Sequence, residues 1–101
     1  MSYDKAFKMS MYRNMLEQRV FEKAVQEQYE EGNIPNSAHL YLGQEAIAAG
    51  VSMALRPDDY ILPSHRGHAQ ILAKGCDMNR MMAELFGRVD GYCKGKGGSM
   101  H

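Results

Sequence analysis

The sequence has 101 residues, of which 12 are basic and 12 are acidic, so its formal net charge at neutral pH is zero. This balance gives no general attraction to nucleic acid or to an anionic membrane surface, and we expect neither as a partner. No apolar run approaches the roughly 20 residues of a membrane-spanning helix, and no signal-peptide pattern is visible. We therefore expect a cytoplasmic protein with Cys76 and Cys93 as reduced thiols.

The length and the last residues predict part of a larger domain. A chain of this size buries only about two thirds of the surface that it exposes when unfolded. The Gly-rich segment 88–101 has no closing helix or strand after it, whereas such loops normally connect elements. We therefore expect residues 1–101 to form the N-terminal part of a single domain.

Hydrophobic periodicity predicts a long helix over residues 3–31, which Gly32 would end. Its apolar face is wide for so short a chain. The simpler interpretation is a core helix, and the alternative is that part of the face contacts another subunit. A second helix is predicted over 43–56, where large apolar residues recur every four positions before Pro57.

Three shorter elements and a loop follow. An apolar run predicts a strand over residues 60–62, which leads into a helix over 64–74 with a serine as its cap. Asp77 is the predicted N-cap of a last helix over 77–86, whose Met-rich face we expect in the core. The loop 88–101 is rich in glycine, which leaves its backbone free to approach a ligand or another chain.

The start of the predicted 64–74 helix has the character of an anion site. His65, Arg66 and His68 fall in its expected first turn, where backbone N–H groups are free and the helix dipole is positive. Phosphate is the anion that we expect there. His39 lies on an earlier loop, where a histidine taken alone is more often a surface residue than a catalytic one.

The segment GYCKGK invites comparison with a Walker A loop, which binds nucleotide phosphates. It has three residues between Gly91 and Gly95 where that motif has four, and no Ser or Thr follows Lys96. A clear strand before it and a helix after it are also missing from the pattern. The sequence therefore gives little support to a nucleotide-hydrolysing site of this kind.

Two other chemistries compete for the histidines. Imidazole and thiolate groups are good zinc ligands, and a zinc site could be formed by His65, His68, Cys93 and His101. Their spacing fits no standard zinc framework, and the neighbouring arginine would repel a metal, so we expect no metal site in this chain. The remaining chemistry is a phosphate-bearing cofactor held by His65 and Arg66, with His39, and more weakly His101, near its reactive end.

Six motifs occur in order between Tyr12 and His101: YRNMLEQRVFE, HLYLGQEA, HRGH, AKG, MMAELFG and CKGKGGSMH. Together they resemble the N-terminal part of the alpha subunit of thiamine-diphosphate-dependent E1 dehydrogenases, the 2-oxo acid dehydrogenase family of pyruvate and acetoin dehydrogenases. The resemblance implies an α/β fold with a parallel sheet, of which this chain is a helix-rich and incomplete part. It also implies a heterotetramer with a beta subunit, a lipoyl-bearing E2 partner, and thiamine diphosphate with Mg²⁺, whose metal ligands would lie beyond residue 101.

The resemblance also implies roles for individual residues. His39 would lie beside the thiazolium and the substrate as a catalytic residue, and His65 and Arg66 would contact the cofactor diphosphate. His68 would line the same cavity as a second catalytic histidine, with His101 at its edge. The implied reaction cleaves a carbon–carbon bond next to a carbonyl and passes the acyl group to E2.

Two questions stay open at this point. Ser–His–Arg stands where many pyruvate enzymes have Tyr–Arg, which favours the acetoin-type branch and leaves a 2-oxo acid or acetoin as the substrate. The second question concerns competence, because residues 1–101 would contain only half of a cofactor pocket. The alternative of a different class is a catalytically inactive helical module whose apolar faces serve association.

Overall fold

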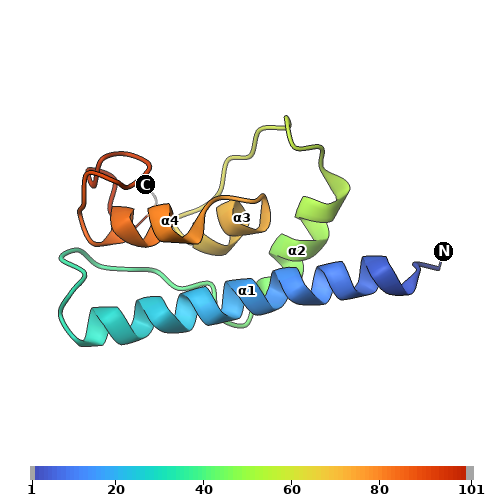
Figure 1. The fold of residues 1–101 in the computed structure, drawn as a ribbon, viewed down its shortest axis with the longest axis horizontal. Helices are drawn as coiled ribbons and strands as arrows, with labels where there is room; N and C mark the ends of the chain where they lie inside the picture. The colour runs from blue at the N-terminus through green and yellow to red at the C-terminus, as the bar shows by residue number, and fades with distance from the viewer. Residues whose placement is uncertain (1, 100–101) are drawn as a thin grey trace.

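A computed structural model describes residues 2–99, and the regular structure in this part of the chain is entirely helical. The helices are α1 (Lys5–Glu30), α2 (Glu45–Ala54), α3 (His68–Ala73) and α4 (Met78–Leu85). Figure 1 shows α1 extending along the molecule, with the other three helices on one side of it. Within residues 2–99, none of the helices has both the length and the apolar character that a membrane crossing requires.

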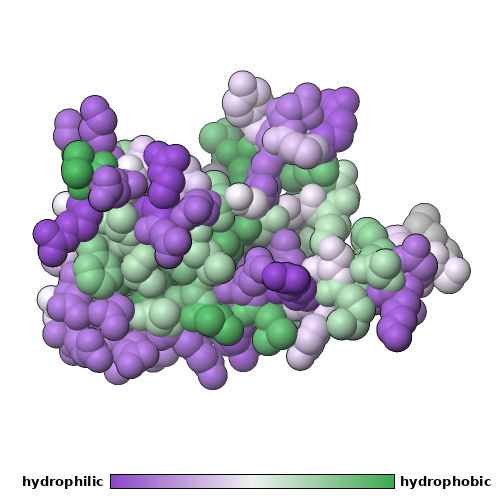
Figure 2. Space-filling view, in the orientation of Figure 1, coloured by the Kyte–Doolittle hydropathy of each residue, from purple (hydrophilic) through white to green (hydrophobic). Residues whose placement is uncertain are grey.

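α1 buries only part of its wide apolar face. Its first turn is capped by Asp4, which accepts a hydrogen bond from the Phe7 N–H. Phe21 and Val25 are buried in the core, in agreement with the simpler interpretation. The adjoining apolar residues remain largely exposed, at 58% for Tyr12, 43% for Leu16 and 63% for Val20. Figure 2 shows hydrophobic surface along α1 between hydrophilic areas.

Two apolar clusters hold the helices together. The larger one joins α1, α3 and α4 to the loop after α1 through Phe21, Val25, Ile34, Leu72, Met81 and Leu85. The smaller one joins the same loop to α2 and α3 through Tyr41, Ala48, Ala69 and Ala73. Three of these four residues are alanines, whose small side chains allow α2 and α3 to pack closely.

The predicted strand over residues 60–62 is not formed, and the expected sheet is absent from residues 2–99. The segment is irregular, and Tyr60 and Leu62 are each 99% exposed. A strand needs a neighbour to pair its backbone N–H and C=O groups, and no strand within the described residues provides one. The predicted strand is therefore wrong for this part of the chain, whereas the expected helix-rich character is confirmed, since its regular structure is all helical.

The helix predicted over residues 64–74 begins later than expected. α3 starts at His68 with Gly67 as its N-cap, and Ser64 does not cap it. The Ser64 Oγ instead accepts the Arg66 N–H at 3.3 Å, a local bond that competes with helix formation. His65 and Arg66 consequently lie in the loop before α3 and not in a helical first turn.

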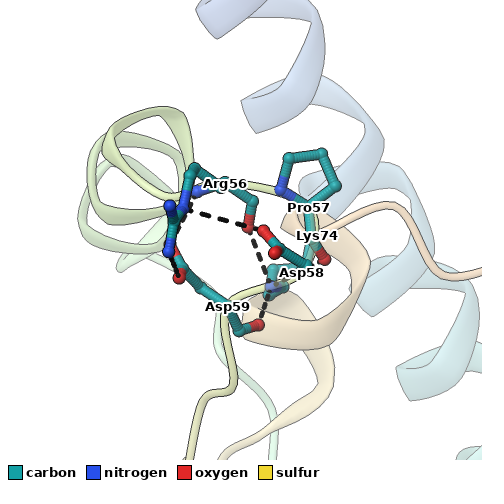
Figure 3. Close-up of polar contacts among 5 residues, drawn as sticks. All are labelled: Arg56, Pro57, Asp58, Asp59 and Lys74. Atoms are coloured by element: carbon teal, nitrogen blue, oxygen red, sulfur yellow. Dashed lines mark hydrogen bonds and ion pairs between the residues drawn. The ribbon is translucent and has the colours of Figure 1, made fainter.

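A charged turn after α2 is fastened to the end of α3. The Arg56 side chain contacts the carboxylates of Asp58 and Asp59, and its backbone N–H donates to Asp59 Oδ2 at 2.8 Å. The Lys74 ammonium, at the end of α3, donates to the backbone carbonyls of Arg56, Pro57 and Asp59 (Figure 3). These contacts hold the chain at residues 56–59, directly before the irregular segment 60–62.

Candidate functional site

Three of the predicted site residues, His39, His65 and Arg66, lie on two loops that contact each other, and we call this group the His–Arg corner. The rings of His39 and His65 meet edge to face, with centroids 5.1 Å apart and an interplanar angle of 84°. Arg66 Nη1 donates to the Leu40 carbonyl oxygen at 2.6 Å, which ties the guanidinium to the residue after His39. Imidazole and guanidinium groups are suitable donors to an anion, and two loops bring them together here.

His68 lies in the core and is fully buried. Its Nδ1 is 2.8 Å from Glu22 Oε1, and its Nε2 is 2.9 Å from Ser99 Oγ. Its ring also packs edge-on against Phe21, with centroids 6.4 Å apart. Both ring nitrogens therefore have protein partners, and His68 does not join the His–Arg corner.

The partners of His68 lead back to the loop that carries His39. Glu22 Oε2 accepts the Tyr41 N–H at 2.6 Å, and Ser99 Oγ accepts the His39 N–H at 3.3 Å. Glu22 and Ser99 were not among the site residues predicted from the sequence. One signal was available for Glu22, because it directly follows Phe21 on the face of α1 that enters the core, where an ionisable residue is rare unless paired.

The Gly-rich loop closes around a buried carboxylate of α4. Glu84 Oε1 accepts the backbone N–H groups of Cys93 at 2.5 Å and Gly95 at 3.0 Å, and Oε2 accepts those of Gly97 at 2.7 Å and Gly98 at 3.2 Å. Burial raises the pKa of Glu84, but these donors outweigh it and hold the pKa below its usual value. These four N–H groups are thus occupied by a carboxylate of the chain itself and are not available to a phosphate.

Two glycines of this loop lie too close to α4 and its end to carry a side chain. A Cβ on Gly91 would lie 2.5 Å from the Glu84 Cα, and one on Gly95 would lie 2.4 Å from the Gly87 carbonyl carbon. The glycine content predicted a close approach of the loop backbone to a ligand or another chain. The loop does make a close approach, but to α4 and the residue that follows it.

An ion pair holds the start of α2 against α1. Arg19 donates through Nε and Nη2 to the two carboxylate oxygens of Glu45, each at 2.9 Å. The Gly43 N–H donates to the same carboxylate at 3.0 Å. The hydrogen bond from Arg19 is the largest cause that lowers the pKa of Glu45, to about 2, against the opposing effect of burial. The pair fixes the end of the HLYLGQEA segment that begins with His39.

The zinc alternative gains no support from the described part of the chain. Within residues 2–99, no group of three or more His, Cys, Asp or Glu side chains is arranged to hold a metal ion. Both ring nitrogens of His68 are engaged in the core, and Cys93 is an exposed free thiol, as Cys76 is a partly buried one. His101 lies outside the described residues.

Comparison with known proteins assigns the chain to a family. The family model of the dehydrogenase E1 component matches residues 12–101, which is nearly the whole chain. The chain belongs to the dehydrogenase E1 family. Its predicted resemblance to E1 alpha subunits is thereby confirmed.

Three curated relatives of this E1 chain show how much of a subunit it represents. The alpha subunit of acetoin:2,6-dichlorophenolindophenol oxidoreductase from Bacillus subtilis is 54% identical over 91 residues, which are 90% of this chain and 27% of that protein. The subunit of the same name from Cupriavidus necator is 43% identical over 98 residues, covering 97% of this chain and 29% of its own length. The pyruvate dehydrogenase E1 component subunit alpha from Rhizobium meliloti is 42% identical over 99 residues, or 98% of this chain and 28% of that subunit. The chain thus spans less than a third of these relatives.

Proposed function

We propose that this chain supplies part of the thiamine diphosphate site of an E1 alpha subunit, and that the His–Arg corner contacts the cofactor. The observation that carries the proposal is the edge-to-face contact of His39 and His65, 5.1 Å between centroids, beside a guanidinium that is anchored on Leu40. When bound, thiamine diphosphate supplies an electron sink for cleavage of a carbon–carbon bond next to a carbonyl. The ligands of its Mg²⁺ are expected outside this chain.

The donor set at the corner fits the charged end of such a cofactor. One nitrogen of the Arg66 guanidinium is held by the Leu40 carbonyl, and a guanidinium carries five N–H donors, so others are available for a second acceptor. Charge-assisted bonds of this kind are the strong ones for phosphate oxygens. His65 is exposed beside Arg66 and adds an imidazole donor.

His39 is the residue to which we assign proton transfer. It is half-buried next to His65, and its backbone is tied to Ser99. Histidine suits the holding or release of a proton near neutral pH. His39 would therefore serve the reacting carbons, while Arg66 and His65 hold the diphosphate. Acetoin is the favoured substrate, with a 2-oxo acid such as pyruvate as the other candidate, and lipoyl-bearing E2 is the expected acyl acceptor.

The role of Arg66 is tested by Arg66→Ala in the alpha subunit assembled with its beta partner. We expect the affinity for thiamine diphosphate with Mg²⁺ to fall about tenfold to a hundredfold, because a hydrogen bond to a charged group is lost. Calorimetric titration measures this affinity. Arg88→Ala is the matched control, since Arg88 is an exposed arginine after α4, and equal affinities for the two variants would remove Arg66 from the site.

The role of His39 predicts a different pattern. We expect His39→Ala to bind the cofactor with nearly normal affinity and to turn over about 100-fold more slowly or worse, because a proton-transfer group is lost. Steady-state kinetics with acetoin and with pyruvate measure the rate and also rank the two substrates by kcat/KM. A variant with the unaltered rate would exclude His39 from the mechanism.

A second candidate function has one observation in its favour. Large apolar side chains remain exposed on α1 and α2, including Val20 at 63% and Ile47 at 60%. Such surface is typical of a chain that associates with others. A catalytically inactive association module is therefore the alternative, and it is compatible with descent from an E1 alpha subunit.

A further inference from the structure

We propose that Glu22, His68 and Ser99 form a positioning unit that holds the backbone of His39 and Tyr41, so that His68 acts through His39 and not on a ligand. The unit extends from α1 through the first residue of α3 to Ser99 in the Gly-rich loop. This inference rests on the proposed function of His39. It changes the role expected for His68 from a catalytic residue to a positioning residue.

The hydrogen bonds form a chain in which each donor meets one acceptor. If His68 Nδ1 carries the proton, it donates to Glu22 Oε1 at 2.8 Å, and Nε2 can then accept the Ser99 hydroxyl at 2.9 Å. The Ser99 Oγ in turn accepts the His39 N–H at 3.3 Å. This assignment of the imidazole tautomer satisfies every group in the chain, whereas a proton on Nε2 alone would leave Nδ1 and the carboxylate as two facing acceptors.

Glu22 joins the two ends of the arrangement. Its Oε1 contacts His68, and its Oε2 accepts the Tyr41 N–H at 2.6 Å. The loop is thus held at two alternate residues, His39 through Ser99 and Tyr41 through Glu22. Leu40, which lies between them, offers its carbonyl oxygen to Arg66. The backbone of three consecutive residues is therefore fixed from three different segments of the chain.

Because the three side chains are buried, each of them needs its hydrogen-bond partner within the unit. Glu22 and His68 are 0% exposed and Ser99 is 4% exposed. A buried polar group that loses its partner is costly, because water cannot replace the lost bond. The network is therefore expected to hold the loop in one geometry, which a site for proton transfer requires.

The same three residue types also make up the catalytic triad of serine hydrolases, but the geometry argues against that function. Ser99 Oγ already bonds to both His68 and the His39 N–H, and its buried position leaves little access for a substrate. A serine nucleophile needs space for the attacked carbonyl and donors for the developing oxyanion. The arrangement is suited to holding a backbone.

The test uses two variants in the assembled alpha subunit, with amide hydrogen exchange read at single residues. Ser99→Ala removes the acceptor of the His39 N–H, and we expect exchange of that amide to become about tenfold faster. Glu22→Gln keeps an oxygen for the Tyr41 N–H but places an NH₂ donor opposite His68 Nδ1, so the imidazole has to adopt the other tautomer and its ring signal should change. Ser52→Ala is the matched control, since the Ser52 hydroxyl bonds to the Ala73 carbonyl at 2.8 Å, outside the unit.

The turnover rate of Ser99→Ala then distinguishes a positioning role of Ser99 from a role in stability alone. We expect Ser99→Ala to lower kcat about tenfold, while the cofactor affinity stays near that of Ser52→Ala. Its unfolding midpoint should fall below that of Ser52→Ala, because the buried His68 Nε2 loses its partner. Unchanged exchange at His39 would overturn the proposal whatever the activity. Faster exchange with unchanged kcat would also overturn it, provided that His39→Ala is slow. If His39→Ala turns over normally, the proposed function fails, while faster exchange still supports the hold on residues 39–41.

Discussion

Two buried carboxylates hold the loop between α1 and α2 near the residues proposed for the site. Glu22 holds the backbone next to His39, and Glu45 holds the start of α2 through Arg19 and the Gly43 N–H. Neither carboxylate contacts the exposed His65. Their contribution to the site is therefore geometric, and for Glu45 it depends on the carboxylate being ionised.

Glu45 makes this dependence measurable. Its pKa falls from an ordinary 4.5 to about 2 in the folded chain. A carboxyl whose folded pKa is depressed stabilises the fold fully above its unfolded pKa, and this stabilisation is lost as the pH falls through the folded value. We therefore expect the thermal unfolding midpoint to fall as the pH is lowered from 4.5 toward 2.

Glu45→Gln should flatten that slope, because an amide does not titrate. The control is Glu17→Gln, which removes an exposed ion pair with Arg13 and should leave the slope in place. Thermal unfolding followed by circular dichroism across this pH range gives the comparison. Equal slopes in the Glu45 variant and the unaltered chain would contradict the role of the Arg19 pair.

At the scale of elements, α4 and the Gly-rich loop are one unit. The carboxylate of Glu84 takes the place of an external anion in organising the loop, and Gly91 and Gly95 allow the loop to lie directly on the helix. Tyr92 adds a further contact, since its hydroxyl accepts the Asp77 N–H at 2.8 Å. Ser99, which lies in this loop, is thereby positioned by α4, and its Oγ is the acceptor for the His39 N–H.

A pair of alanine variants isolates this packing from backbone strain. Gly32 and Gly95 have nearly the same backbone angle, φ 83° and φ 80°, but only Gly95 would place a Cβ against other atoms. We expect Gly32→Ala to cost about 1–2 kcal/mol, the strain of a left-handed alanine. Gly95→Ala should cost more than about 3 kcal/mol, because overlap with the Gly87 backbone is added. Denaturant unfolding measures the loss of unfolding free energy in both variants. Similar losses would mean that the loop shifts away from Gly87 to make room for the added Cβ.

The elements also show what sequence reasoning can reach. The helices follow from apolar spacing and from caps such as Asp77, which accepts the Arg80 N–H at 3.0 Å as expected of an N-cap. The segment 60–62 has the composition of a strand but no partner within residues 2–99, and pairing is not a local property. The burial of His68 depends on Glu22 and Ser99, which are 46 and 31 residues away, so no local pattern could indicate it.

At the scale of the whole molecule, apolar surface is left uncovered beside α2. A groove of about 360 Å³ lies between α2 and the irregular segment 60–62, and Ile47, Val51, Leu55 and Ile61 are among the residues that line it. Hydrophobic areas of this kind are also visible in Figure 2. A chain that spans 27% to 29% of its relatives is consistent with such incomplete cover.

The 101-residue chain alone should therefore self-associate at micromolar concentrations and fail to bind thiamine diphosphate. We expect Ile47→Lys combined with Val51→Lys to shift the chain toward monomer, because a charge opposes burial of this surface. Light scattering after size-exclusion chromatography measures the mass. Val89→Lys is the control, since Val89 is 72% exposed and does not line the groove. A monomeric unaltered chain would count against the association module.

The ammonium of Lys74 has a consequence for the chemistry of this chain with reagents. Its N–H groups are engaged by the carbonyls of Arg56, Pro57 and Asp59, whereas Lys5, Lys8 and Lys23 lie on an exposed side of α1. An amine has to leave its acceptors and lose a proton before it can be acylated, so Lys74 should react last among these lysines. The rate at which Lys74 is acylated would therefore report how often the junction between α2 and α3 opens. An acetyl group on Lys74 would then prevent these hydrogen bonds from forming again.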